Sequence, residues 1–293
     1  MKTLLLLLAL LLTSSGLRAA CENPKPLRLA LIPKSNAQQL RQTMAPLVRA
    51  LEHALKRRVE LGVSHSYGAV VEGLLGGTVD LAELGPASYA LLMQRDPVAQ
   101  PVAALSARSA PGAGIATYQS VLITRADGGL DQIDKLRQRS VSLTDPASTS
   151  GALLPRQALP QLTGQPLESF FGQVSYAGSH DRAIAAVRRR LVDAAFVSST
   201  RLEEAMDRQL VGADEFRVLW RSHPLPGDPF VLRNALCPEL RALVRQTLLA
   251  QRPDFAPMFE GLNAGPFVAA TAQDYQGVLG LFDRERAGGV PVR

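Results

Sequence analysis

Hydrophobic residues in the first third of the chain form short apolar runs separated by longer amphipathic segments. The runs at 27–32, 58–63 and 79–84 have the length of buried strands. The segments at 36–55 and 66–75 carry apolar residues at the three- and four-residue spacing of helices. Strands that alternate with helices in this way predict an α/β lobe with a parallel sheet.

A second stretch of alternating strands and helices begins after a segment rich in glycine, alanine and proline at 110–116. Strand-like runs occur at 117–124 and 192–197, with a helix expected at 183–190. The turn before the run at 192–197 leads into Val-Asp and small hydrophobic residues, as does the turn before the third strand. This similarity predicts two α/β lobes of related design.

The composition also predicts that the chain crosses between the two lobes twice. The change at 110–116 marks the first crossing, and a segment rich in proline and glycine at 219–229 marks the return. Helices expected near 238–250 and 273–286 would pack on the first lobe. The predicted division is a leader at 1–20, lobe 1 at 21–116 and 225–293, and lobe 2 at 117–224.

The first twenty residues have the composition of an export signal. Lys2 precedes a nearly unbroken run of leucines, and small residues continue to Ala20, which is the pattern of a secretory signal peptide. Cys21 follows directly, so a lipid anchor is an alternative to a soluble exported protein. Arg18 argues against the anchor, because a lipobox has an aliphatic residue there. In an oxidising compartment Cys21 and Cys237 could pair, although the sequence leaves this open.

Charge and composition narrow the class of partner. Hydrophobic residues make up 46% and charged residues 20% of the chain, the balance of a globular protein. The formal charge is +6, and it is +4 without Lys2 and Arg18 of the leader. The arginines alternate with acids along helical stretches, which indicates a solvated surface instead of a nucleic-acid-binding one. The 4 histidines have no metal-ligand spacing, so no metal site is expected.

A hydroxyl-rich turn is the strongest candidate for a binding site. A strand ends at 141–143, Asp145-Pro146 breaks it, and a helix is expected to run to Leu159. A helix start has backbone N–H groups without partners and the positive end of the helix dipole. Together with three hydroxyl side chains this predicts a cradle for an anion. The alternative is that one serine caps the helix and the other hydroxyls only form the turn. The hydroxyl residues are Ser148, Thr149 and Ser150.

Further short motifs are spread along nearly the whole mature chain. They lie at 31–33 with Asn36, at Tyr67, 79–82, 85–89, 118–120, 145–151, 178–181, 226–231 and 265–268. In their order and spacing the chain resembles the periplasmic substrate-binding proteins of phosphate, phosphite and phosphonate ABC transporters.

The resemblance implies a type II periplasmic binding protein fold. Such a protein has two hinged α/β lobes, each a mainly parallel sheet flanked by helices, and closes on a phosphorus oxyanion in the cleft between them. The resemblance implies no cofactor. The ligand-binding positions that it suggests are Ser148, Thr149, Ser150, His180, Tyr67 and Tyr118, with Asp228 as an acidic candidate.

Each of these positions also has a simpler interpretation. His180 stands in a Gly-Ser-His-Asp turn, where a histidine can donate a hydrogen bond to an anion but can also merely open a helix. Half-buried packing is the commoner role of a tyrosine such as Tyr67 or Tyr118. Asp228 precedes a proline and could serve only to shape a turn.

The sequence departs from the family members that take aminoalkylphosphonates. Those members carry a carboxylate for the ligand's amine just after the Val-Asp-Ala strand, where this chain has Thr200-Arg201 and no acid before Glu203. Lys34 lies in a loop where the family often has an acid. Because a buried ammonium without a carboxylate partner is costly, we expect phosphite, methylphosphonate, phosphate or a related oxyanion, and not aminoethylphosphonate.

The function that the resemblance implies is transport. We expect a monomeric periplasmic carrier that delivers the oxyanion to an ABC permease in the inner membrane. A ligand-sensing subunit for a membrane histidine kinase is the alternative, because fold alone does not separate the two. An enzyme acting on a phosphorus ester is not expected, because Ser148 and His180 have no third orienting residue in the sequence pattern.

Overall fold

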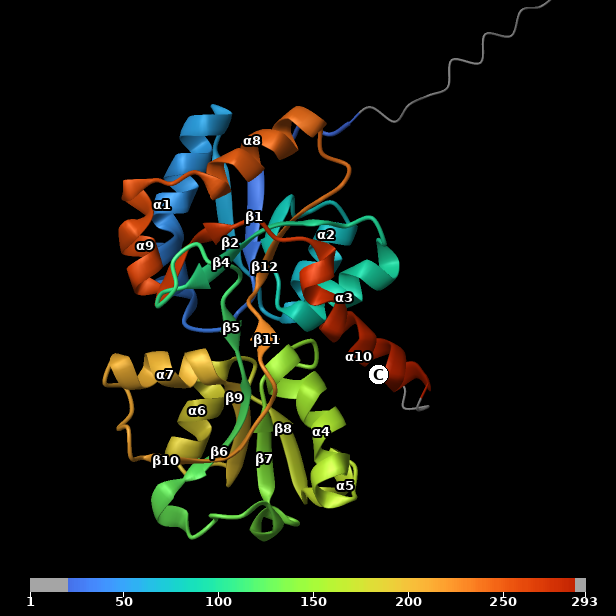
Figure 1. Ribbon diagram of the computed structural model, residues 1–293, viewed down its shortest axis with the longest axis vertical. Helices are drawn as coiled ribbons and strands as arrows, with labels where there is room; N and C mark the ends of the chain where they lie inside the picture. Colours follow the sequence, from blue (N-terminus) through green and yellow to red (C-terminus); the bar gives the residue numbers. More distant parts are fainter. Residues whose placement is uncertain (1–20, 288–293) are drawn as a thin grey trace, which may run out of the picture.

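The computed structural model describes residues 21–287, so the predicted signal peptide at 1–20 lies outside the described residues. The chain forms two α/β lobes, lobe 1 above lobe 2 in Figure 1. The two-lobed α/β fold expected from the sequence is confirmed.

Lobe 1 has a six-stranded sheet with helices on both faces. Its strands are β1 (Leu27–Leu31), β2 (Val59–Val63), β3 (Leu81–Glu83), β4 (Pro101–Ala107), β12 (Pro229–Leu232) and β13 (Ala264–Val268). Its helices are α1 (Ala37–Leu55), α2 (Tyr67–Leu75), α3 (Pro86–Arg95), α8 (Pro238–Leu249), α9 (Ala256–Gly261) and α10 (Gln276–Ala287). The strand order is β13-β4-β12-β3-β1-β2.

Alternation along the strands explains why both faces of this sheet are covered. In β1, Leu27, Leu29 and Leu31 belong to the core under α1, α8 and α9. Ala30 and the following Ile32 belong to the core under α2 and α3. Successive side chains of a strand point to opposite faces, so a strand that is apolar at every position needs helices on both sides.

Lobe 2 follows the same plan with a five-stranded sheet. Its strands are β6 (Ser120–Arg125), β7 (Ser140–Leu143), β8 (Gln173–Tyr176), β9 (Ala194–Ser198) and β10 (Phe216–Arg221), in the order β10-β6-β9-β7-β8. Its helices are α4 (Leu154–Thr163), α5 (Leu167–Phe170), α6 (His180–Arg188) and α7 (Ser199–Asp207). In β6, Val121 and Ile123 pack on the α6 and α7 side, and Leu122 packs on the α4 and α5 side.

Both sheets are mixed, but in each of them most strands run in one direction, as expected, and β6, β12 and β13 run in the opposite direction. β1 is parallel to β2 and β3, but β12 is antiparallel to β3 and β4, and β13 is antiparallel to β4. In lobe 2, β7 is parallel to β8 and β9, whereas β6 is antiparallel to β9 and β10. β6 and β12 begin where the chain enters each lobe from the other, at the edge where the parallel strands end, and must therefore run in the opposite direction.

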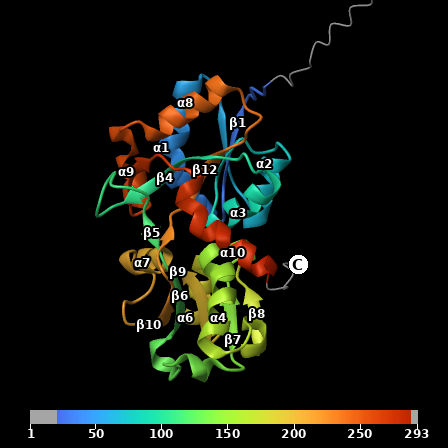
Figure 2. The same ribbon diagram turned by 45° about the vertical axis from the view of Figure 1, so that its right-hand side comes forward.

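Two short strands carry the chain between the lobes. β5 (Thr117–Tyr118) and β11 (Leu225–Pro226) pair antiparallel to each other, and they lie side by side between the two sheets in Figure 1. A third connection is made by α10, which reaches from lobe 1 to α4 (Figures 1 and 2). There Gln157 donates a hydrogen bond to the Leu281 carbonyl, 2.9 Å.

The beginning of the described chain is fixed to lobe 1 at the end remote from lobe 2 (Figure 1). Cys21 and Cys237 form a disulfide with an S–S distance of 2.08 Å, so the pairing considered from the sequence is present. Glu22 pairs with the Arg233 guanidinium, which also contacts Asp80 at 3.1 Å. With its sulfur in the disulfide, Cys21 has no thiol for a lipid thioether. Among the described helices, none combines the length and the hydropathy needed to cross a bilayer.

Candidate functional site

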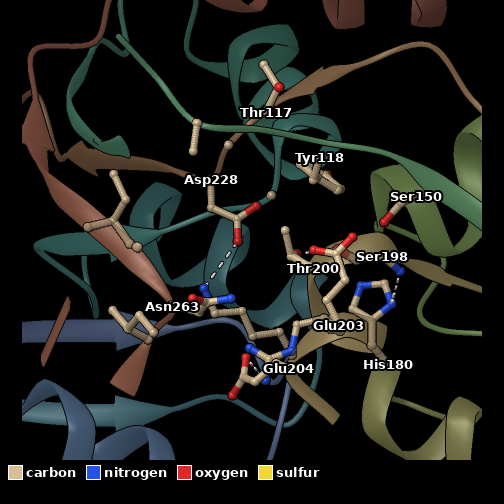
Figure 3. Close-up of a pocket in the computed structure, with 18 of the residues that line it drawn as sticks. Thr117, Tyr118, Ser150, His180, Ser198, Thr200, Glu203, Glu204, Asp228 and Asn263 are labelled. Carbon is tan, nitrogen blue, oxygen red and sulfur yellow. Dashed lines mark hydrogen bonds and ion pairs between the residues drawn. The ribbon is translucent and has the colours of Figure 1, made fainter. Parts of the chain in front are cut away.

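A cavity of about 650 Å³ lies between the two lobes. Its lining comes from strand ends and helix starts of both lobes, together with the crossing strand β5 (Figure 3). All of the site residues predicted from the sequence line this one cavity: Ser148, Thr149, Ser150, His180, Tyr67, Tyr118 and Asp228. That these residues contact a ligand remains a prediction.

The hydroxyl-rich turn opens a helix, as expected, but its first turn is wider than an α-helix. Residues Thr149–Leu153 form one π-helical turn, and α4 continues from it. Ser148 is the N-cap, because its hydroxyl accepts a hydrogen bond from the Gly151 N–H at 3.1 Å. The capping interpretation therefore holds for Ser148, while Thr149 and Ser150 also line the cavity.

The hydroxyls of the turn contact groups from the rest of the cleft. Thr149 Oγ1 accepts a hydrogen bond from the Ala87 N–H at the start of α3, 2.8 Å. Burial raises the pKa of the Tyr118 hydroxyl, with a further increase from Asp228, while hydrogen bonds with Thr149 and Ser150 oppose the increase. The turn thus forms a small network of hydroxyl groups with β5.

Further hydrogen bonds join lobe 1 to this turn. The Tyr67 N–H at the start of α2 donates to Asp145 Oδ2 at 3.2 Å. The Ser88 hydroxyl donates to the Ala147 carbonyl at 3.0 Å. Two helix starts of lobe 1 therefore meet the helix start of lobe 2, so partial positive charge from three backbone segments converges beside the cavity.

His180 is placed by the start of α6 and by the end of β9. Ser179 caps the helix by accepting a hydrogen bond from the Arg182 N–H at 3.2 Å. His180 Nδ1 accepts a hydrogen bond from the Ser198 N–H, 3.1 Å (Figure 3). Since Nδ1 accepts, the neutral ring carries its proton on Nε2. Burial lowers the pKa of His180 to about 3, helped by the charges of Arg201 and Lys34. At neutral pH the side chain is an uncharged donor.

The Tyr67 hydroxyl is a buried donor without a partner. Among the described residues it is one of few buried side-chain polar atoms with no hydrogen bond, and Arg201 Nε is another. Both residues line the cavity. Burial raises the pKa of Tyr67 well above its ordinary value, and Asp228 and Asp145 add to this, so the group keeps its proton. An unsatisfied buried hydroxyl is costly unless a ligand accepts from it.

Charged residues also line the cavity. Lys34 Nζ lies 2.6 Å from Glu83 Oε1 and 3.3 Å from Asp228 Oδ2. On α7, Arg201 pairs with Glu204 at 2.6 Å. Each of these cations is matched by a nearby carboxylate, so the cavity has no free strong positive charge from Lys34 or Arg201.

Comparison with known proteins identifies the family of this chain. A family model described as the periplasmic substrate-binding protein of a phosphonate ABC transporter matches residues 29–275. The chain belongs to this family. The family is one of transport proteins, so the sensor interpretation is not favoured.

Similar proteins cover nearly the same length. The phosphate-import protein PhnD of Mycolicibacterium smegmatis is 30% identical over 278 residues, which span 90% of this chain and 84% of that protein. The phosphonates-binding periplasmic protein of Escherichia coli is 25% identical over 256 residues, 85% of this chain and 74% of that protein. The structure of PhnD1 from Prochlorococcus marinus with methylphosphonate has a TM-score of 0.79 at 19% identity and covers 90% of this chain and 99% of that one.

Several residues that line the cavity of this phosphonate-transporter binding protein were not predicted from the sequence. Glu83 stands at the carboxyl end of β3, and the rule that ligands bind at such strand ends would have found it. Glu203 was noted only as the next acid after the strand, yet it lines the cavity together with Glu204. The end of β4 and Asn263 before β13 also line it, and they were missed because neither strand was predicted.

Proposed function

We propose that this member of the family binds a phosphorus oxyanion in the cavity and releases it to an ABC permease. The observation that carries the proposal is the convergence of neutral donors on one part of the cleft. Ser148, Thr149 and Ser150 stand at a helix start, His180 carries an Nε2–H donor, and the Tyr67 hydroxyl has no partner among the residues that the structure describes. Relatives named for phosphate and phosphonate import support the same ligand class.

Neutral donors are suited to a phosphonate or phosphate group. Its terminal oxygens each accept more than one hydrogen bond, and a hydrogen bond to a charged acceptor is roughly twice as strong as a neutral one. Helix starts add a field that favours negative charge without a lysine or arginine. We propose that the oxygens replace the mutual hydrogen bonds of Thr149, Ser150 and Tyr118.

The two crossing strands offer a hinge. We propose that residues 21–116 with 225–293, and residues 117–224, move as two bodies about β5 and β11, and that ligand binding favours the closed arrangement. The protein would work as a monomer in the periplasm after removal of residues 1–20, as a carrier without chemical turnover.

The test is calorimetric titration of the protein that begins at Cys21. The ligands are methylphosphonate, phosphite, phosphate, aminoethylphosphonate and sulfate. The variant with Ser148→Ala, Thr149→Ala and Ser150→Ala should lose at least about a hundredfold in affinity, because several charge-assisted hydrogen bonds are removed together. The matched control is Ser169→Ala, which removes an exposed hydroxyl outside the cavity.

Two results would contradict the proposal. One is a folded wild-type protein that gives no heat with any of these anions. The other is a triple variant that binds as tightly as the wild type. Release of phosphate from a phosphate monoester by the wild type, absent from the triple variant, would instead indicate an enzyme.

A further inference from the structure

The charged wall of the cavity contains one ammonium held between two carboxylates. Lys34 Nζ contacts Glu83 at 2.6 Å and Asp228 at 3.3 Å. The side chains of Lys34 and Glu83 are 11% and 4% exposed. Glu83 belongs to β3, and Asp228 lies between β11 and β12, so the three residues come from separate parts of lobe 1 and its crossing.

This cluster interacts electrostatically with the neutral donors of the same cavity. Lys34 is among the charges that lower the pKa of His180, and Asp228 is among those that raise the pKa of Tyr67 and Tyr118. Burial lowers the pKa of Lys34, but the attraction of Glu83 and Asp228 outweighs it, so the lysine stays protonated. The ammonium and the oxyanion donors are therefore parts of one site.

Removing the ammonium would leave two carboxylates facing each other in a largely buried wall. Such a pair is unfavourable unless a cation enters, because buried charges need a partner. A ligand that carries an ammonium beside its oxyanion could supply that cation. In the native chain the lysine side chain already occupies the position.

We propose that Lys34 is a specificity-determining residue whose ammonium takes the place of a ligand ammonium between Glu83 and Asp228, so that the cleft selects phosphonates without an amino group. The inference rests on the proposed function and names the ligand class of that site. Arg201 on α7 has a similar effect, because it pairs with Glu204 at 2.6 Å and so occupies a carboxylate that a ligand ammonium would need. Glu203 also lines the cavity but is exposed, so solvent screens its charge.

The test compares two ligands of equal size in matched variants. Aminoethylphosphonate and n-propylphosphonate differ only in an ammonium that replaces a methyl group. The wild type should prefer n-propylphosphonate by at least about tenfold, and Lys34→Ala should shift the ratio toward aminoethylphosphonate by at least about tenfold. Lys135→Ala is the control, because it removes a lysine paired with Asp131 on the surface and should leave the ratio at the wild-type value.

A second variant guards against misfolding of Lys34→Ala. In the double variant Lys34→Ala with Glu83→Gln, Asp228 is the one charged residue left of this cluster, so the repulsion between two carboxylates is removed. The shift in the ratio should then be smaller but in the same direction. If both folded variants bind n-propylphosphonate and the ratio moves by less than about twofold in each, the inference is wrong.

A ligand-independent measurement separates this inference from the proposed function. Ethylammonium chloride should raise the melting temperature of Lys34→Ala relative to sodium chloride at equal ionic strength, and should not do so for the wild type. If the wild type binds no phosphorus oxyanion but this stabilisation is seen, the proposed function fails and the role of Lys34 as a built-in ammonium stands. If phosphonates bind and neither variant responds to ethylammonium or to aminoethylphosphonate, only the role of Lys34 fails.

Discussion

Two groups of residues that line the cavity solve the problem of burying polar groups in opposite ways. One group of lining residues, mostly from lobe 2, presents neutral hydroxyls, a neutral imidazole and a helix start. The other group presents full charges that are already paired, Lys34 with Glu83 and Asp228 on the lobe 1 side and Arg201 with Glu204 on α7 of lobe 2. Lys34 and Arg201 are each paired with a carboxylate, whereas Arg108, which also lines the cavity, donates a hydrogen bond to Asn263 Oδ1 at 3.2 Å.

Because of this difference, attraction of an oxyanion and discrimination between ligands can reside in different residues. Neutral donors held by backbone contacts, as His180 is by the Ser198 N–H, favour any small oxyanion at neutral pH and need no change of protonation. Paired charges cost much to disturb, so they discriminate between ligands that do and do not carry a matching charge.

The largest expected effect comes from distorting the hydroxyl-rich turn, which provides several of the neutral donors. A Cβ on Gly151 would collide with the Thr144 side chain and lie 2.9 Å from Ser148 Oγ. We expect Gly151→Ala to destabilise the fold by about 3 kcal/mol and to abolish oxyanion binding, because the turn must open to relieve the contact. Chemical denaturation and calorimetry measure the two effects.

The matched control is Gly277→Ala on the exposed side of α10, where the new Cβ has no neighbour within 4 Å among the described residues outside its own stretch of helix. There the change should be neutral or stabilising by up to about 1 kcal/mol. Equal stability and equal binding of the two variants would show that the packing of the turn does not matter.

A smaller effect should appear in the dependence of stability on pH. The pKa of His180 is lowered to about 3 in the fold, first by burial, from an ordinary value near 6.5. Above pH 6.5 the ring is neutral in both states. As the pH falls below 6.5, the unfolded chain takes up a proton that the folded chain does not, so stability falls until about pH 3. Between pH 7 and pH 5 this histidine should remove about 2 kcal/mol.

His180→Asn keeps an acceptor for the Ser198 N–H and removes the titration. Denaturant midpoints without ligand should therefore fall less between pH 7 and pH 5 in this variant than in the wild type. The exposed His65→Asn serves as control and should follow the wild type. Parallel curves for wild type and His180→Asn would mean that His180 is not the neutral group described.

The smallest expected effect separates a ligand contact from a structural hydroxyl. Tyr67→Phe removes a hydroxyl that has no partner within residues 21–287, so we expect unchanged stability and a loss of about tenfold in affinity, or roughly 1.4 kcal/mol. Tyr89→Phe removes a hydroxyl that donates to the Ala99 carbonyl at 3.1 Å in the core of lobe 1. It should lower stability by about 1 kcal/mol and leave affinity unchanged. The reverse result would place the Tyr67 hydroxyl outside the binding site.

Much of this protein could be predicted because its information is local. Apolar alternation at 27–32 and helical periodicity at 36–55 lie within a short window, and β1 and α1 form there. The pattern that predicts an anion cradle is also local, since the strand end, Ser148 and Gly151 lie within about ten residues. Strands β8 and β10 were not predicted, because partly polar strands at sheet edges have a weak hydrophobic signal.

What the tertiary structure decided depends on contacts between distant residues. From the sequence alone we predicted an anion site with His180 as a candidate, but the charge and the tautomer of this histidine were undetermined. Only the fold brings Ser198 to His180 and so fixes the neutral Nε2–H form. Only the fold places Lys34 between Glu83 and Asp228, which are 49 and 194 residues away in sequence. Burial and pairing of charges are properties of three-dimensional packing, and periodicity within a window carries no information about them.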